Sequence, residues 1–310
     1  MGGKNGMSKL TVFEYPYQYA AWRVNRENPE MVIAERRPFE SGRRAVEDYR
    51  LCGVYGKTGE PYCVTTVDGK SHPDLQLHEA IALELSEQCC KAVSRKEKVL
   101  ISSGYCALAP AIVGGIQQAI GTEKRIGVVW IDAHGDNRIV KNSSEPEVRF
   151  VSFPLSTILG QTMDDWRTQF CRLEKPCSGD NILISDARCA SPQEQENLRQ
   201  TGVHWVGEHG FEEPMTWESQ VQRLSDRVDA IFLMVDADIM TSDCIPAYFR
   251  KEPGGHSVWK VMQNVRMVMQ SGKVVAFACF CVDFDKYEQG GDVTYLNGMR
   301  VIGAGLESWR

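Results

Sequence analysis

Stretches of consecutive apolar residues recur from about residue 99 to the end of the chain. Runs of this kind, in which polar residues do not alternate with apolar ones, are typical of parallel strands that helices cover on both faces. The sequence therefore predicts buried strands at Val99–Ile101, Ile126–Ile131, Asn181–Ile184, Val203–Val206, Ala230–Val235 and Lys273–Cys281.

Segments with helical spacing lie between these runs. Apolar residues recur every four positions from Leu77 to Cys89, which predicts an amphipathic helix. Further helices are predicted at Ala107–Ile120, Met215–Leu224 and Ser257–Met269. This alternation predicts a single α/β domain over residues 1–310, with a doubly wound, mostly parallel sheet and helices on both faces. The first seventy residues show neither pattern clearly, and we expect them to be irregular.

Two acidic clusters follow directly after two of the predicted strands. Asp132, His134 and Asp136 come after one strand, and Asp236 and Asp238 come after another. Side chains two positions apart in extended chain point the same way, and parallel strands end at a common edge of the sheet. Several buried carboxylates need an opposing charge, which a divalent cation supplies. Either cluster alone is more typical of a solvated turn, but the two together predict a metal site.

Composition argues against several other classes of protein. The net charge is −6 without a basic stripe, which argues against nucleic acid as a partner, and no apolar stretch is long enough to cross a membrane. The eleven cysteines are an odd number, and Cys89 and Cys90 are adjacent, so a secreted disulfide framework is not expected. We therefore expect a cytoplasmic protein with no nucleic-acid or membrane partner.

The order of these motifs resembles that of the ureohydrolases, a family that includes arginase, agmatinase and formiminoglutamase. Trp130–Asp136 is similar to the family's Asp-Ala-His-x-Asp element, and Val235–Ile239 with Pro246 downstream resembles its Asp-x-Asp element less closely. The resemblance is clearest from Lys98 to the C-terminus. It implies an arginase-like fold and hydrolysis of a C–N bond in a guanidino or amidine-type small molecule, with release of urea or a related product. It also implies a homo-oligomer, either a trimer or a hexamer.

The resemblance further implies a set of metal ligands. Asp132 and Asp236 would bridge two ions, and the complete set would be Cys106, Asp132, His134, Asp136, Asp236 and Asp238. Oxygen ligands with one imidazole suit Mn²⁺, which is the expected ion. The family usually has histidine where this chain has Cys106, and a thiolate at that position favours Zn²⁺. An alternative interpretation of Cys106 is a small buried residue at the start of a helix.

Two positions depart from the family's catalytic residues. Aligning Phe153–Leu155 with the family's Met-Pro-Leu segment places Val151 where those enzymes carry a proton-shuttling histidine. The end of the last strand places Cys281 where they carry a glutamate that contacts the guanidinium group. Asp283 lies two residues further on and would substitute if the register is shifted. The catalytic candidates are therefore Asp136, which would orient the attacking water, and Asp283.

The loop after the first acidic cluster holds the candidate substrate contacts. Arg138 is a candidate for binding a substrate carboxylate, and Asn142 and Ser143 would add polar contacts. A surface arginine and ordinary turn formation also explain these three residues.

Three hypotheses of function follow from the sequence. The leading one is a metal-dependent hydrolase of the ureohydrolase type acting on a small-molecule substrate. The second is an arginase-like homologue that has lost metal binding or hydrolysis and serves as a binding or structural protein, as Cys106, Val151 and Cys281 suggest. A third, a mononuclear zinc deacylase, requires a histidine pair acting on water, which this chain lacks near the motifs.

Overall fold

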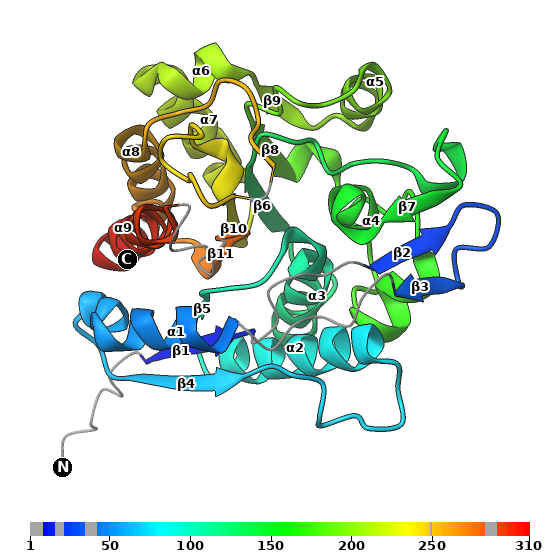
Figure 1. Ribbon diagram of the computed structural model, residues 1–310, viewed down its shortest axis with the longest axis horizontal. Coiled ribbons are helices and arrows are strands. Elements are labelled where there is room, and N and C mark those ends of the chain that lie inside the picture. Colours follow the sequence, from blue (N-terminus) through cyan, green and yellow to red (C-terminus); the bar gives the residue numbers. More distant parts are fainter. Residues whose placement is uncertain (1–8, 16–21, 35–41, 249, 283–289) are drawn as a thin grey trace.

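The computed structural model describes residues 9–15, 22–34, 42–248, 250–282 and 290–310. In this part of the chain, eight parallel strands form one sheet in the order β4-β1-β5-β11-β10-β6-β8-β9 (Figure 1). Their bounds are β1 Leu10–Glu14, β4 Tyr62–Thr66, β5 Lys98–Ile101, β6 Ile126–Ile131, β8 Ile182–Ser185, β9 His204–Val206, β10 Ala230–Asp236 and β11 Val274–Phe280.

Helices cover both faces of this sheet because each central strand is apolar on both sides. Trp130 of β6 packs into the core on one face, and its neighbour Val129 packs into the core on the other. The helices are α1 Gly42–Leu51, α2 Leu77–Ser94, α3 Ala109–Ile120, α4 Pro154–Ile158, α5 Pro192–Thr201, α6 Glu208–Glu212, α7 Pro214–Arg227, α8 Val258–Met269 and α9 Gly291–Ser308. The predicted doubly wound α/β fold is therefore confirmed.

Short helical turns connect several of these elements. They are η1 Val54–Thr58, η2 Cys106–Leu108, η3 Val140–Asn142, η4 Phe150–Ser152, η5 Trp166–Phe170, η6 Gly179–Asn181 and η7 Ala237–Ile239. Two of them lie near the candidate ligands: η7 directly follows the end of β10, and η2 begins at Cys106, a short loop after the end of β5.

The expectation of an irregular N-terminal segment is wrong for the described part of residues 1–70. β1 lies inside the main sheet between β4 and β5, and all five of its residues are buried. A second, antiparallel sheet joins β2 Trp22–Asn25 with β3 Val32–Ala34 and β7 Glu147–Arg149. These strands are as short as β5, β8 and β9, but no helical pattern was recognised between them, so the alternation of strands with helices gave no signal here.

Close backbone contacts hold the helical layers on the sheet. Gly114 of α3 lies so near the chain at Cys171 that an added Cβ would stand 1.8 Å from that carbonyl oxygen. At the other end of the chain, α9 lies beside α8 and packs on its own sheet, where the Trp309 indole N–H donates to the Val274 carbonyl at 2.7 Å (Figure 1). None of the helices in the described residues combines the length and hydrophobicity needed to cross a lipid bilayer.

Candidate metal centre

The pairing of β6 with β10 brings the two acidic clusters together. Val235 pairs with Ile131, so the residues that follow, Asp236 and Asp132, lie side by side at the ends of the two strands. The loops then interlock through hydrogen bonds from backbone to carboxylate. The N–H of His134 donates to Asp132 Oδ1 at 2.7 Å, and the N–H of Ala133 donates to Asp238 Oδ1 across the two loops at 3.2 Å.

His134 lies at the centre of one group of potential ligands. Its Nδ1 is 2.9 Å from Asp238 Oδ2 and 3.5 Å from Asp132 Oδ1. The potential ligand atoms of these three residues all lie within 4.8 Å of one another. On the other side of the ring, Nε2 is 3.3 Å from Glu252 Oε1, and Cys189 joins these two residues in a second group of the same compactness.

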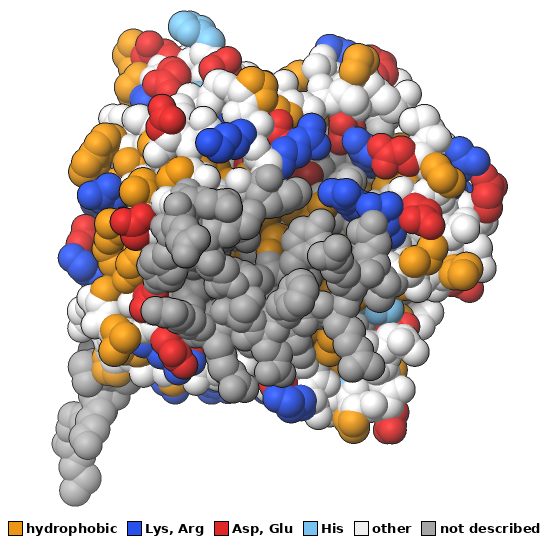
Figure 2. Space-filling view, viewed as in Figure 1, with side chains coloured by type: hydrophobic (Ala, Val, Ile, Leu, Met, Phe, Trp, Pro, Cys, Tyr) orange, Lys and Arg blue, Asp and Glu red, His pale blue; other side chains and the backbone are white. Residues whose placement is uncertain are grey.

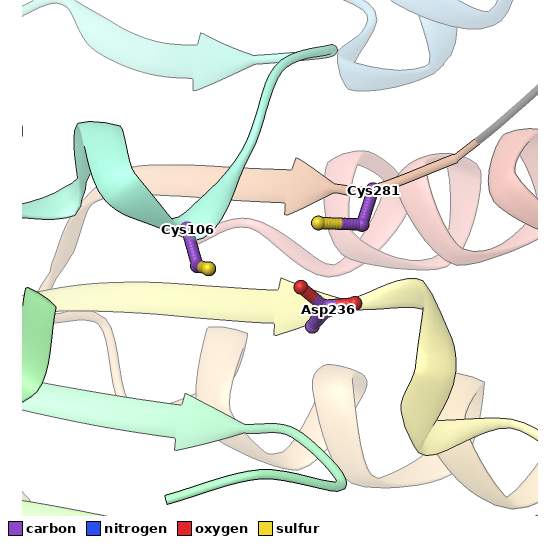
Figure 3. Close-up of side chains that lie close together, drawn as sticks. All are labelled: Cys106, Asp236 and Cys281. Carbon is purple, nitrogen blue, oxygen red and sulfur yellow. The ribbon is translucent and has the colours of Figure 1, made fainter. Parts of the chain in front are cut away.

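A third group combines two thiols with one carboxylate. Cys106, Asp236 and Cys281 are all buried, and their Sγ and carboxylate oxygen atoms also lie within 4.8 Å of one another. Figure 3 shows the three side chains converging from the start of η2, the end of β10 and the residue after β11. Cys281 has a φ of 59°, which is rare for a residue other than glycine, and its N–H donates to the Gly104 carbonyl at 2.8 Å.

The electrostatics of the protein groups oppose full ionisation of the cluster. Burial, followed by the charge of Asp238, raises the pKa of Asp132 to about 6. Burial is also the largest cause that raises the pKa values of Asp136 and Asp236. Buried carboxyl groups with such shifts take up protons unless a positive charge lies near them. A divalent cation would supply that charge and keep all of them ionised.

His134 already provides part of this compensation. Burial acts to lower the pKa of His134, but its hydrogen bonds to Asp132 and Asp238 outweigh burial, and the net direction is upward. For Asp238, burial acts to raise the pKa, while the hydrogen bond to His134 and its charge lower it below the usual value. The protein therefore holds a charged His134–Asp238 pair. A bound metal ion would separate this pair and use both side chains as ligands.

The chemistry of the donors differs between the two sides of the centre. Asp132, His134 and Asp238 offer two carboxylates and one imidazole, which fit a divalent ion of the Mn²⁺ type. Cys106, Asp236 and Cys281 offer two sulfur atoms and one carboxylate, and sulfur ligands do not match the preference of Mn²⁺. The residues therefore fit a manganese-like ion on the first side only.

These groups surround a cavity of about 390 Å³, and all of them except the fully buried Asp132 line its wall. Cys106, Val151 and Cys281, the three departures from the family pattern, line the same cavity as Asp136 and His134. The wall also carries acidic and basic side chains, namely Arg23, Arg138, Arg149, Arg250, Glu145, Glu194 and Glu252. On the face shown in Figure 2, Lys and Arg side chains likewise gather in a band with Asp and Glu among them.

Comparison with known proteins agrees with this geometry. The protein-family model for the arginase family matches residues 44–304. The chain belongs to the arginase family. An arginase from Entamoeba histolytica in complex with L-ornithine is 17% identical with a TM-score of 0.78, and the match covers 97% of this chain and 98% of that one. A formimidoylglutamase from Bacillus subtilis is 14% identical with a TM-score of 0.73, covering 99% and 88%. The resemblance that the motifs indicated is confirmed.

Similarity in sequence is lower and covers less of each chain. An arginase from Bacillus caldovelox is 28% identical over 142 residues, which are 42% of this chain and 46% of that protein. An agmatinase from Pyrococcus horikoshii is 22% identical over 116 residues, 37% of this chain and 40% of that protein. The chain thus matches less than half the length of these two curated relatives. The arginase-like fold is shared, whereas the substrate is not settled by these relatives.

Of the three predicted substrate contacts in this arginase-family chain, one lines the cavity and two do not. Arg138 lines the cavity, where its Nη1 is 3.0 Å from Glu145 and its Nε is 3.6 Å from Glu194. Asn142 and Ser143 do not belong to the cavity lining, and the Ser143 hydroxyl accepts a hydrogen bond from the Glu145 N–H within its own turn. The predicted catalytic residue Asp283 lies outside the described residues.

Sequence reasoning missed several residues of the centre. The Tyr248 hydroxyl donates to Asp238 Oδ2 at 3.1 Å, and Glu252 approaches His134 from the same loop. Their loop has no periodic pattern, and the only available signal was its position after the Asp-x-Asp element. His256 was not expected to be a ligand. Its side chain is buried and lies 2.5 Å from Glu212 and 3.2 Å from Asp186, outside the groups of potential ligands.

Proposed function

We propose that this protein is a metal-dependent hydrolase that cleaves a C–N bond in a guanidino or amidine-type small molecule and releases urea or a related product. The observation that carries this proposal is the compact group of Asp132, His134 and Asp238 within 4.8 Å, of which His134 and Asp238 line a cavity. Membership of the arginase family supports the same reaction class. Mn²⁺ is the proposed ion for this group because its donors are two carboxylates and an imidazole.

Each residue of the centre has a specific part in this reaction. A divalent ion, when bound, would lower the pKa of water and stabilise the charge that develops as the substrate carbon becomes tetrahedral. Asp136 is buried beside the cavity and would accept a hydrogen bond that orients the attacking water. Tyr248 would fix the carboxylate of Asp238 through its hydroxyl. Asp283 stays a second catalytic candidate.

We also infer that the substrate carries an anionic group. Four arginines line the cavity, and Cys281 stands where the resemblance implies a carboxylate that contacts a guanidinium. The side chain of Arg149 is exposed and has no ion-pair partner among the described residues, whereas Arg138 is paired with Glu145. A substrate carboxylate would therefore bind Arg149 without first displacing another carboxylate. Arg138, and Asn142 and Ser143 nearby, remain further candidates.

A substrate panel tests the proposal directly. The Mn²⁺-loaded protein would be incubated with arginine, agmatine, hydroxyarginine, guanidinobutyrate and formiminoglutamate, and urea, ammonia and formamide would be measured. We expect turnover of substrates that carry a carboxylate and none of agmatine, which lacks one. The Asp136→Asn variant serves as a control and should lose at least about 100-fold in rate. Absence of product from every compound, with Mn²⁺ or Zn²⁺, would refute the hydrolase.

The three replacements in one cavity support a second candidate function. Cys106, Val151 and Cys281 line the cavity together, so a homologue that binds a small molecule without hydrolysing it is the alternative. Metal analysis of protein purified without chelator separates the two. An ion that remains bound after gel filtration favours the hydrolase, and failure to load any divalent ion favours the binding protein.

We further propose the setting in which the protein works. It would be a single domain that assembles into a homo-oligomer, a trimer or a hexamer, in the cytoplasm. Its partner would be a small molecule, without nucleic acid or membrane. The net charge of −6 supports the exclusion of nucleic acid, and the many free cysteines among the described residues suit a reducing compartment.

A further inference from the structure

The thiol side of the centre has donors of a different chemistry from the imidazole side. Cys106 Sγ, Cys281 Sγ and a carboxylate oxygen of Asp236 lie within 4.8 Å of one another, and all three side chains are at least nine-tenths buried. In a tetrahedral zinc site, sulfur and oxygen ligands about 2.0–2.3 Å from the ion stand between 3 and 4 Å apart, so small side-chain movements would complete such a site. The three residues come from separate elements, and Figure 3 shows them facing one point.

The surroundings of these thiols differ from those of Cys279, the buried cysteine of β11. Cys279 lies two residues before Cys281 on the opposite face of the strand, within the apolar core. Cys281 instead follows the strand, faces the cavity and has the positive φ of 59° that turns its backbone there. Cys106 meets the carboxylate of Asp236 in the same cavity. Simple packing explains Cys279, whereas two thiols beside a buried carboxylate form a set of metal ligands.

We propose that Cys106, Asp236 and Cys281 bind a thiophilic divalent ion such as Zn²⁺ through two thiolates and one carboxylate. The fourth position faces the cavity, where water or Asp136 would complete the tetrahedron. The inference rests on the proposed function only in placing a cation in the same cavity, and it holds whether or not hydrolysis occurs. Cys281 has no metal-binding counterpart in the ligand set that the family resemblance implies. This centre therefore prefers Zn²⁺ over Mn²⁺ on its thiol side.

Cobalt spectroscopy tests the proposed ligands. The reduced, full-length protein would be titrated anaerobically with Co²⁺, which replaces Zn²⁺ and gives a cobalt–thiolate charge-transfer absorption in the near ultraviolet. We expect this absorption to saturate at one ion per chain and to disappear when Zn²⁺ is added, but not when Mn²⁺ is added. Cys106→Ser and Cys281→Ser should each remove most of the absorption and weaken Zn²⁺ binding at least about tenfold.

Two cysteine variants provide matched controls. Cys189→Ser removes a thiol that lines the same cavity beside His134 and Glu252, and Cys279→Ala removes the thiol on the far face of β11. Both should retain the cobalt absorption. Loss of the absorption in Cys189→Ser, with retention in the Cys106 and Cys281 variants, would place the ion on the imidazole side and overturn the inference.

A measurement on the unaltered protein covers the case in which the serine variants fail to fold. Zn²⁺ should protect Cys106 and Cys281 from alkylation, as read by peptide mass spectrometry, while the exposed Cys52 reacts at the same rate with or without the ion. Equal alkylation of both cavity thiols with and without Zn²⁺ would refute the site. Zn²⁺ protection combined with no product from the substrate panel would leave this inference standing and remove the hydrolase instead.

Discussion

Cys106 and Cys281 occupy positions where the family resemblance implies histidine and glutamate, and both thiols line the cavity. A thiol in place of an imidazole keeps a donor at that position but changes the ions that it prefers. A thiol in place of a carboxylate removes a negative charge that would pair with a guanidinium group. At the scale of single residues, the proposed effect of these two replacements is a different choice of ion and a different charge on the substrate.

Replacing Cys106 by histidine tests this interpretation. Cys106→His would restore a nitrogen donor next to Asp136 and Asp236, and we expect Mn²⁺ affinity to rise at least about tenfold. Isothermal titration calorimetry with Mn²⁺ gives the comparison, and Cys189→His is the control because that position lies on the other side of His134. Unchanged Mn²⁺ affinity in the Cys106 variant would show that the sulfur does not limit manganese binding.

The residues of the centre could be predicted from the sequence only where they follow an apolar run. Asp132 comes directly after β6 and Asp236 is the last residue of β10, so a strand prediction also places them at the sheet edge. Glu252 and Tyr248 lie in an irregular loop, and their approach to His134 and Asp238 depends on how that loop folds back. No local pattern encodes such a contact.

At the scale of elements, strands buried on both faces were the easiest to predict. β6 and β10 have no alternating polar residues, and their observed bounds agree with the apolar runs to within a residue. β1 is equally buried and longer than β5 or β8, but no recognised helical pattern precedes it to mark an alternation of strands with helices. Its place between β4 and β5 is a long-range pairing that only the whole fold determines.

The close contact between α3 and the chain after η5 predicts that adding one methyl group there lowers the free energy of unfolding substantially. Gly114→Ala would place a methyl group 1.8 Å from the Cys171 carbonyl oxygen, so backbone must move. We expect the free energy of unfolding in urea to fall by about 3 kcal/mol. Gly56→Ala is the control because a Cβ there has nothing within 4 Å. A loss below about 0.5 kcal/mol at Gly114 would contradict the packing described.

His78 near the start of α2 gives a pH dependence of stability. Its ring stacks on Trp166 at 5.5 Å, and burial lowers its pKa from 6.5 to about 4. Between these two values the unfolded chain binds a proton that the folded chain does not, so stability is present above pH 6.5 and is lost as the pH falls towards 4. At pH 5 this group accounts for a loss of about 2 kcal/mol relative to pH 7.

The His78→Phe variant isolates that contribution. Phenylalanine keeps an aromatic ring against Trp166 but does not titrate, so its free energy of unfolding should fall less between pH 7 and pH 5 than that of the unaltered protein. Urea denaturation at both values gives the difference of about 2 kcal/mol, and measurement at pH 8 corrects for altered packing. An identical fall in both proteins would mean that the folded state protonates His78 near its usual pKa.

At the scale of the whole molecule, the motifs were sufficient to indicate the family and the fold. The order of the motifs along the chain indicated the family, and parallel strands that end at one edge of the sheet bring the motifs together. Assembly does not follow in this way. Several large side chains are exposed in the described part of the chain, and Trp259 of α8 is 64% exposed with Arg300 stacked over it. Scattered apolar residues of this kind do not define an interface by themselves.

The proposed oligomer predicts a definite mass in solution. Light scattering coupled to size-exclusion chromatography should give three or six times the mass of one chain, and this should persist at micromolar concentration because such interfaces bury large areas. A single-chain mass over the whole concentration range would rule out the trimer and the hexamer. The same measurement on the Zn²⁺-loaded protein shows whether the ion affects assembly.

The order of strands in the sheet has one further consequence. β5, β11, β10 and β6 are consecutive neighbours, and a residue of the centre lies at or after the end of each, namely Cys106, Cys281, Asp236 and Asp132. Cys106, Cys281 and Asp132 lie beyond the paired residues of their strands, whereas Asp236 still pairs with Phe280, so substitution of the first three leaves the strand pairing in place. The metal ion proposed for this centre can therefore be changed by substituting these side chains one at a time, with the pairing of the strands retained.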